Sequence, residues 1–173
     1  SRKYSAPYSI RSPPPEIFVG VVSNQNPNNF DSIYNIGYCL YQLNDYKNAI
    51  KKFTQALLLN SSEAKVYYYL GKSYIYIDKK KQALESLIMS IKLDRYNGDA
   101  HFELGKIYES ILKIDLAMEE YRLADKYIDN HGLNYIYGIL LYKEQLYNEA
   151  LNSLREFIIY EPDNKEVLEI LGE

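Results

Sequence analysis

Hydrophobic residues recur at intervals of three and four along the chain from residue 30 onward, in short segments that polar turns separate. The stretches at residues 43–45 (Leu-Asn-Asp) and 78–80 (Asp-Lys-Lys) are typical of these turns. Spacing of this kind places apolar side chains on one face of a helix. The pattern therefore predicts paired amphipathic helices, each of which needs a neighbour to cover its apolar face.

Small residues repeat with a fixed period through the same region. Glycines occur 34, 34, 33 and 34 residues apart, and an alanine follows each of the first four after twelve residues. The glycines are Gly37, Gly71, Gly105, Gly138 and Gly172, and the alanines are Ala49, Ala83, Ala117 and Ala150. A period of this length indicates stacked structural repeats. The paired small residues predict points where two helices cross closely, because a bulkier side chain would force them apart.

The residues around these glycines resemble the tetratricopeptide repeat (TPR) family. Leucine precedes glycine at 70–71, 104–105 and 171–172, and tyrosine follows three residues later at Tyr74 and Tyr108. An aromatic residue stands sixteen residues after the glycine in two repeats, and Pro162 ends the fourth repeat as the family pattern requires. The resemblance covers residues 30–173. It implies an all-α fold, an α-solenoid of stacked antiparallel helix hairpins that forms a TPR superhelix.

The resemblance also divides the chain into repeats. It implies four repeats and a partial fifth after a proline-rich extended N-terminal segment at residues 1–29. The TPR domain would span residues 30–173, with units at 30–63, 64–97, 98–130 and 131–164 and a partial unit at 165–173. The third unit is one residue short near residues 129–132, which predicts a local kink.

Twenty tyrosines are present, and the repeat register sorts them. Nine stand where the family packs its core or its inter-helix turn: Tyr46, Tyr67, Tyr74, Tyr108, Tyr121, Tyr127, Tyr137, Tyr147 and Tyr160. The family resemblance implies that a second face of each first helix lines a concave groove for a protein or peptide partner. The predicted groove residues are Tyr34, Tyr38, Tyr41, Tyr68, Lys72, Tyr76, Phe102, Lys106, Tyr135 and Tyr142. The alternative is that A/T-rich codons and family habit explain part of the excess, and that groove tyrosines pack on one another.

The first 29 residues differ in composition from the rest of the chain. They contain five of the six prolines, among them the run at 13–15, which favours an extended conformation. An apolar stretch follows, in which Ile17, Phe18, Val21 and Val22 are predicted to dock on the first repeat or on a neighbouring chain. The alternative is a linker left after removal of a signal or anchor.

Composition and residue types narrow the function classes. The net charge of −3 argues against nucleic acid as a ligand, since binding it usually needs a concentrated basic surface. No apolar run approaches the length of a membrane-spanning helix. The two histidines, His101 and His131, lie 30 residues apart, and His101 falls at a core position of the repeat. No catalytic, metal-binding or cofactor-binding pattern is visible, so we expect a protein without enzymatic activity or cofactor.

These observations predict a non-enzymatic protein-interaction scaffold that holds a partner segment in a tyrosine-lined groove, with Lys72, Lys106 and Lys143 as polar contacts. The alternative is a structural subunit that contacts neighbours in a larger assembly through its ends, convex face and N-terminal tail, self-association included. A third interpretation is an accessory domain of an enzyme. Because the chain starts at Ser1, we expect a fragment or a processed product, and the compartment stays open between cytoplasm and bacterial cell envelope.

Overall fold

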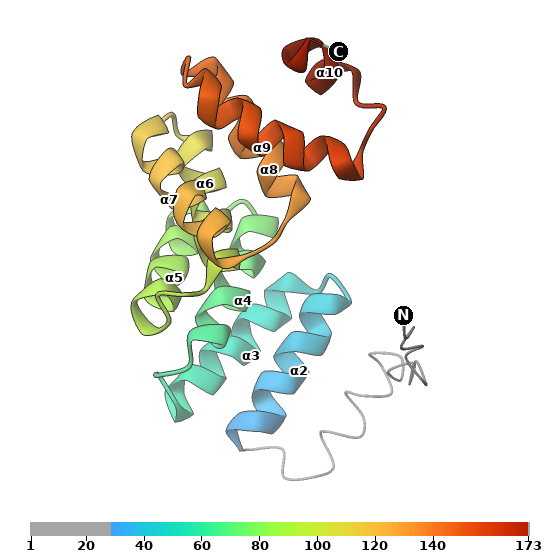
Figure 1. Cartoon of the computed structure of the whole chain (residues 1–173). Coiled ribbons are helices and arrows are strands. Elements are labelled where there is room, and N and C mark those ends of the chain that lie inside the picture. Colours follow the sequence, from blue (N-terminus) through green and yellow to red (C-terminus); the bar gives the residue numbers. More distant parts are fainter. Residues whose placement is uncertain (1–28, 173) are drawn as a thin grey trace, which may run out of the picture. The chain divides into compact units, whose positions relative to one another are not determined.

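The computed structural model describes residues 29–172, and every regular element in this range is an α-helix (Figure 1). The all-α prediction is therefore confirmed for these residues. The structure consists of two compact units, the first ending at Ser61 and the second beginning at Ser62. The predicted docking residues Ile17, Phe18, Val21 and Val22 lie outside the described residues.

The part of the first unit that the structure describes, residues 29–61, forms a helix hairpin of α2 (Phe30–Gln42) and α3 (Tyr46–Leu59). Each helix begins at a polar cap, which satisfies a backbone N–H group that has no partner within the helix. The Asn29 side chain accepts from the backbone N–H of Ser32 at 2.7 Å, and Asp45 accepts from that of Asn48 at 3.3 Å. The two helices close on the fully buried ring of Phe53.

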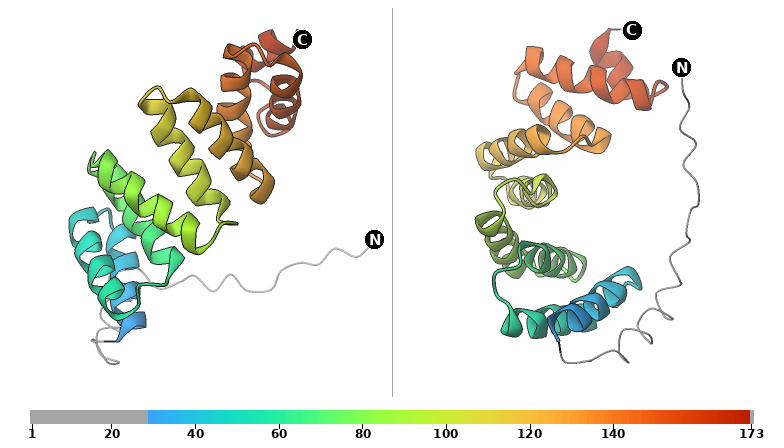
Figure 2. Two further views of the ribbon diagram at one scale, coloured as in Figure 1. Left: turned by 90° about the vertical axis from the view of Figure 1, so that its left-hand side faces the viewer. Right: turned by 60° about the horizontal axis from the view of Figure 1, so that its bottom comes forward.

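The second unit contains three further hairpins and one additional helix. In chain order the elements are α4 (Ala64–Tyr76), α5 (Lys80–Leu93), α6 (Gly98–Ser110), α7 (Ile114–Tyr127), α8 (His131–Lys143), α9 (Tyr147–Tyr160) and α10 (Lys165–Leu171). Figure 2 shows the hairpins of this unit stacked one on the next, as in a helical solenoid. A single hairpin cannot bury its own apolar face, so the stacking supplies the core.

The close helix crossings that the glycines predict are present. A Cβ atom at Gly71 would lie 2.9 Å from the side chain of Leu87, and one at Gly105 would lie 2.5 Å from the ring of Tyr121. Gly138 meets Leu154 in the same way at 2.7 Å. Each of these side chains comes from the second helix of the hairpin, sixteen residues after the glycine. Glycine thus leaves the room that one large core side chain fills.

The buried face of the first helices is wider than the sequence analysis predicts. The residue five positions before the glycine is buried in each repeat of the second unit, at Val66, Ala100, Leu133 and Val167. The residue two positions after the glycine is buried as well, at Ser73, Ile107 and Leu140. The predicted core positions Tyr74 and Tyr108 are only half-buried. Within the second unit, α6 and α8 each pack on their own partner helix and on the preceding hairpin, and two contacts bury a broader arc than one.

The turns inside the hairpins share an uncommon backbone conformation. The residue seven positions after the glycine has a positive φ in all four hairpins: Asn44 at 61°, Asp78 at 56°, Leu112 at 59° and Gln145 at 64°. Asn and Asp adopt this left-handed region more readily than other residues with a Cβ atom. Leu112 therefore occupies its position at an energetic cost.

Candidate functional site

In the first unit, the predicted groove residues Tyr34 and Tyr38 form a continuous aromatic row with Phe30. The ring centroids are 6.2 Å apart for Phe30–Tyr34 and 6.4 Å apart for Tyr34–Tyr38, and both pairs are stacked. The Gln42 side chain donates to the Tyr38 hydroxyl at 2.7 Å and continues the row by one turn. We call Phe30, Tyr34 and Tyr38 the aromatic ladder of α2; the spacing of four residues places all three on one face.

The third predicted tyrosine of this unit, Tyr41, does not belong to the ladder. Its ring meets that of Tyr46 edge to face at a centroid distance of 5.7 Å, next to the turn between α2 and α3. Tyr34 also contacts the core, because its ring lies 6.1 Å from that of the buried Phe53. The ladder is thus supported from beneath by the core of the hairpin.

In the second unit, the structure joins the predicted groove residues of α4 and α6 through a carboxylate. Glu103 is 8% exposed; one carboxylate oxygen lies 2.7 Å from Lys106 Nζ and the other lies 3.6 Å from Lys72 Nζ. Lys72 stands over the ring of Tyr68 at 5.5 Å, and Lys106 stands over the ring of Phe102 at 4.9 Å. We call these five residues the lysine–glutamate bridge.

The bridge changes the ionisation of its members. Burial raises the pKa of the Tyr68 hydroxyl well above its ordinary value, and nearby Lys72 offsets only part of this rise. Burial by itself would lower the pKa of Lys72, but Tyr68 and Glu103 together raise it. The hydroxyl therefore stays protonated and the ammonium stays charged at neutral pH. Glu103 is not among the predicted groove residues, although its position three residues before Lys106 is a signal for an ion pair.

The predicted separation of groove tyrosines from core tyrosines holds only in part. Tyr121 is fully buried as predicted, and Tyr76, a predicted groove residue, is 55% exposed at the end of α4. Tyr68 and Tyr74, in contrast, are both half-buried and both pack against the core cluster of Ala83 and its neighbours. A groove tyrosine in this unit can therefore be part of the core as well.

Two tyrosines with a predicted place in the core or in an inter-helix turn are exposed. Tyr147 is more than half exposed at the start of α9, and Tyr160 is 57% exposed at its end. Tyr160 stacks on the ring of His131, with centroids 5.3 Å apart. Tyr147 is the first residue of α9 and Tyr160 is the last, so both stand beside a turn rather than in the core.

The last two predicted groove residues lie on α8. The Tyr135 hydroxyl donates to the Glu166 carboxylate of α10 at 2.7 Å, and its ring lies 4.9 Å from that of Phe157. Tyr142 is exposed and lines an open cavity of about 340 Å³ together with Ile139 and residues of α10. A second cavity, of about 270 Å³, lies between α4 and α6 and is lined by Ile75, Glu103, Lys106 and Ile107, among others.

His101 is buried against α7, as expected for a core position. Its Nδ1 lies 2.6 Å from a carboxylate oxygen of Glu120, and its Nε2 lies 3.1 Å from the backbone carbonyl of Arg95. Both partners are acceptors, so the ring donates to both only in its protonated form. Burial alone would lower the pKa of His101, but these two hydrogen bonds raise it.

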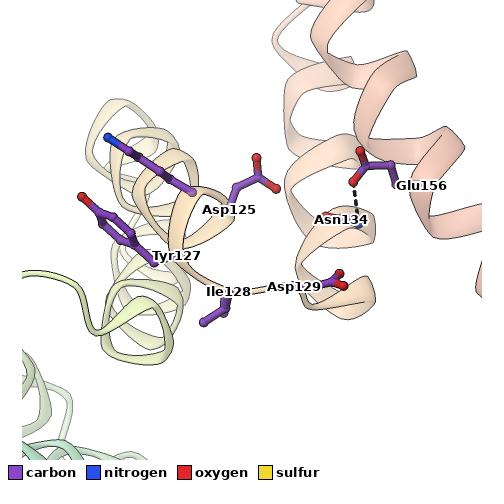
Figure 3. Close-up of a pocket in the computed structure, with 7 residues that line it drawn as sticks. Asp125, Tyr127, Ile128, Asp129, Asn134 and Glu156 are labelled. Atoms are coloured by element: carbon purple, nitrogen blue, oxygen red, sulfur yellow. Dashed lines mark hydrogen bonds between the residues drawn. The ribbon is translucent and has the colours of Figure 1, made fainter.

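A polar cavity of about 430 Å³ opens where the shortened third repeat joins the fourth (Figure 3). The connection between α7 and α8 has three residues, whereas those before α6 and α10 have four. Asp125, Asp129 and Glu156 line this cavity, and the buried Asn134 side chain donates to Glu156 at 3.2 Å. Burial and the charge of Glu156 raise the pKa of Asp125.

Within residues 29–172, His, Cys, Asp and Glu side chains form no group of three or more that could hold a metal ion. In the same part of the chain, each helix is too short or too polar to cross a membrane.

Comparison with known proteins supports the repeat interpretation. The sequence model of a family described as anaphase-promoting complex, cyclosome, subunit 3, matches residues 16–90. No curated protein matches the chain in sequence.

Solved structures show the fold. MamA is 23% identical with a TM-score of 0.72, over 86% of this chain and 87% of its own. YrrB, described as a TPR protein with an unusual peptide-binding site, is 21% identical with a TM-score of 0.77, over 89% and 80%. PilF of Pseudomonas aeruginosa is 19% identical with a TM-score of 0.76, over 87% and 69%.

Proposed function

Because the chain is a tetratricopeptide repeat protein, we propose that it is a non-enzymatic interaction scaffold that binds a segment of a partner protein on its tyrosine-lined face. Each unit has its own set of predicted contact residues. The set of the first unit is Tyr34, Tyr38 and Tyr41, and that of the second is Tyr68, Lys72, Tyr76, Phe102, Lys106, Tyr135 and Tyr142. The likeness to YrrB, a TPR protein described with a peptide-binding site, supports a peptide-like ligand.

The observation that carries this proposal is the lysine–glutamate bridge between α4 and α6. Glu103 holds both lysines, and each lysine lies over an aromatic ring of its own helix. Side chains held in this way lose little conformational entropy when a ligand binds. Tyrosine adds a large amphipathic surface whose hydroxyl can hydrogen-bond to a peptide backbone. A fixed surface of this kind suits recognition better than a set of mobile side chains.

The same bridge predicts the chemistry of the partner. Glu103 already neutralises much of the charge of Lys72 and Lys106, so few ionic contacts remain for a ligand. We expect binding through apolar and aromatic contacts, with only a moderate dependence on salt concentration. A partner segment that carries two or three apolar anchors fits this surface.

A selection of peptides from a displayed library against the full chain tests the proposal. The selected peptides are then titrated calorimetrically against Tyr76→Ala and Tyr160→Ala variants. The two tyrosines are matched, because they are 55% and 57% exposed and each is the last residue of its helix, Tyr76 of α4 and Tyr160 of α9. Tyr76→Ala should weaken binding by about 2 kcal/mol, which is typical of an interface hot spot, and Tyr160→Ala should have little effect.

A binding role of the tyrosine face would be contradicted if both variants lost the same amount of peptide affinity. It would also be contradicted if both variants bound the peptides as tightly as the parent protein does. A circular dichroism melt of each variant verifies that the fold is retained. Tyr68→Ala is a poorer probe, because Tyr68 also packs against the core.

A second candidate function is that of a structural subunit in a larger assembly, with contacts through the ends, the convex face or the tail. The family whose sequence model matches residues 16–90 is described as a subunit of such a complex. Large apolar side chains away from the groove also favour it, since Leu112 is 84% exposed and Ile159 is more exposed than Tyr76. Loss of a partner after Leu112→Ser but not after Tyr76→Ala would favour this second function.

A further inference from the structure

We propose that the apolar segment at residues 17–22 packs, within the same molecule, on the aromatic ladder of α2. The proposal is independent of the partner bound by the second unit. It assigns a ligand to a surface of the first unit, and that ligand is a named part of this chain.

The aromatic ladder has the properties of a docking surface for an apolar strand-like segment. The planes of Phe30 and Tyr34 differ by 5° and those of Tyr34 and Tyr38 by 21°, so three rings form one nearly continuous band. The band is fixed, because Tyr34 lies against buried Phe53 and Gln42 donates to the hydroxyl of Tyr38. All three rings are half-buried.

The sequence before α2 supplies a matching segment. Residues 17–22 read Ile-Phe-Val-Gly-Val-Val, with no charged side chain among them. Residues 23–29 read Ser-Asn-Gln-Asn-Pro-Asn-Asn, a composition that favours a change of chain direction. The last of these, Asn29, already caps α2 through its side chain. An apolar run, a turn-forming stretch and a capped helix in this order predict that the run folds back onto the helix.

The lengths agree with this arrangement. Seven residues lie between Val22 and Phe30, and the eight residue steps from one to the other span up to about 26 Å in an extended chain. The ladder runs over eight residue steps of helix, from Phe30 to Tyr38, which is about 12 Å. The segment can therefore reach any ring of the ladder in an antiparallel direction, with Val22 near Phe30 and Ile17 near Tyr38.

The region that matches the family model includes the apolar segment and leaves out the three prolines before it. The matched region begins at residue 16, directly before Ile17 and directly after the three prolines at 13–15. Residues 17–22 thus belong to the part of the sequence that resembles a repeat protein. In the proposed arrangement this segment covers the ladder, and an external partner of the first unit would have to displace it.

Disulfide trapping in the full chain tests the proposal. The buried Cys39, the single cysteine of the chain, is first replaced in a Cys39→Ala background. Two variants then combine Phe18→Cys with Gln42→Cys, at the end of the ladder, or with Lys51→Cys, on the exposed side of α3. Docking within the molecule should make the intrachain disulfide to position 42 form about tenfold faster, or more, because it raises the effective concentration of the two thiols.

Equal rates at positions 42 and 51 would overturn the proposal and leave the segment as a tether. A disulfide-linked dimer through position 42 at low protein concentration would also overturn it, because the occupant would then be a second copy. As a second measurement, Phe18→Ser should speed amide hydrogen exchange in α2 and leave α9 unchanged. Peptide binding that depends on Tyr76 should survive this change, which separates the present proposal from the proposed function.

Discussion

In the α4–α5 and α6–α7 hairpins, the space beside the glycine of the first helix is filled by side chains of different chemistry. In the α4–α5 hairpin, the aliphatic side chain of Leu87 fills the space beside Gly71. In the α6–α7 hairpin, Tyr121 takes the corresponding place beside Gly105 and is also fully buried. Leucine needs only apolar neighbours, whereas a buried tyrosine hydroxyl needs a hydrogen-bond partner.

In the third hairpin, that partner is a side chain of α6 at a position where other repeats have a predicted groove residue. The Tyr121 hydroxyl donates to the Glu109 carboxylate at 2.7 Å. Glu109 lies four residues after its glycine, the position at which the predicted groove residues Tyr41 and Tyr142 stand in their repeats. His101 and Glu120 form a second polar link between the same two helices. One aromatic core residue thus changes both the interior of its repeat and the surface available to a partner.

The substitution Tyr121→Ala should have the largest effect on stability. We expect it to lower the free energy of unfolding, measured by urea denaturation, by about 3–5 kcal/mol. The ring is fully buried and lies 6.0 Å from those of Phe102 and Tyr137, so its removal leaves a cavity between three helices. Leu87→Ala, at the same position of the other hairpin, should cost less, because it leaves no carboxylate without its partner.

The control for this comparison is Tyr121→Phe, which keeps the ring and removes the hydroxyl. We expect it to cost about 1 kcal/mol, the net value of an ordinary hydrogen bond. A loss as large as that of Tyr121→Ala would show that the hydrogen bond to Glu109, and not the packing beside Gly105, stabilises the third hairpin.

A smaller effect on the free energy of unfolding should come from pH, because the protonation of His101 changes with pH. The pKa of His101 is raised in the folded chain above its ordinary value near 6.5. Its contribution to stability is therefore fully present below the unfolded pKa and is lost as pH rises through the folded pKa. Urea denaturation between about pH 5 and pH 9 should show this loss for the parent and not for His101→Asn.

The carboxylate partner provides a check on this mechanism. Glu120→Gln removes the charge that stabilises the imidazolium, so it should flatten the same part of the pH profile. Parallel profiles for the parent and both variants would mean that the link between α6 and α7 does not depend on protonation. The α4–α5 hairpin has Tyr67 at the position of His101 and lacks this link.

The smallest expected effect concerns the turns of the two hairpins. Asp78 and Leu112 occupy the same left-handed position, with φ of 56° and 59°. Leu112→Asn should stabilise the chain by about 1 kcal/mol, since asparagine adopts this conformation more readily than leucine. Asp78→Leu should destabilise it by a similar amount in the same urea assay. A loss of stability for Leu112→Asn would instead indicate that this exposed leucine makes a stabilising contact.

The periodic features of this protein follow from its sequence. The glycine and alanine register predicts the helix pairs and their crossings, because close approach of two backbones admits only small side chains there. Pro162 and the polar turns predict where helices end. The buried character of His101 also follows from its place in the register, and the structure confirms it at 4% exposure. These features depend on contacts within one hairpin, which a local pattern encodes.

The tertiary structure decided which tyrosines are buried and which charges meet. Tyr121 and Tyr160 both stand at predicted core or turn positions, yet one is enclosed by α6 and α8 and the other is exposed at a helix end. Lys72 and Glu103 come from different hairpins, so only the stacking of α4 beside α6 brings them together. Burial and ion pairing between repeats depend on how one hairpin covers the next, and no spacing within a single repeat contains that information.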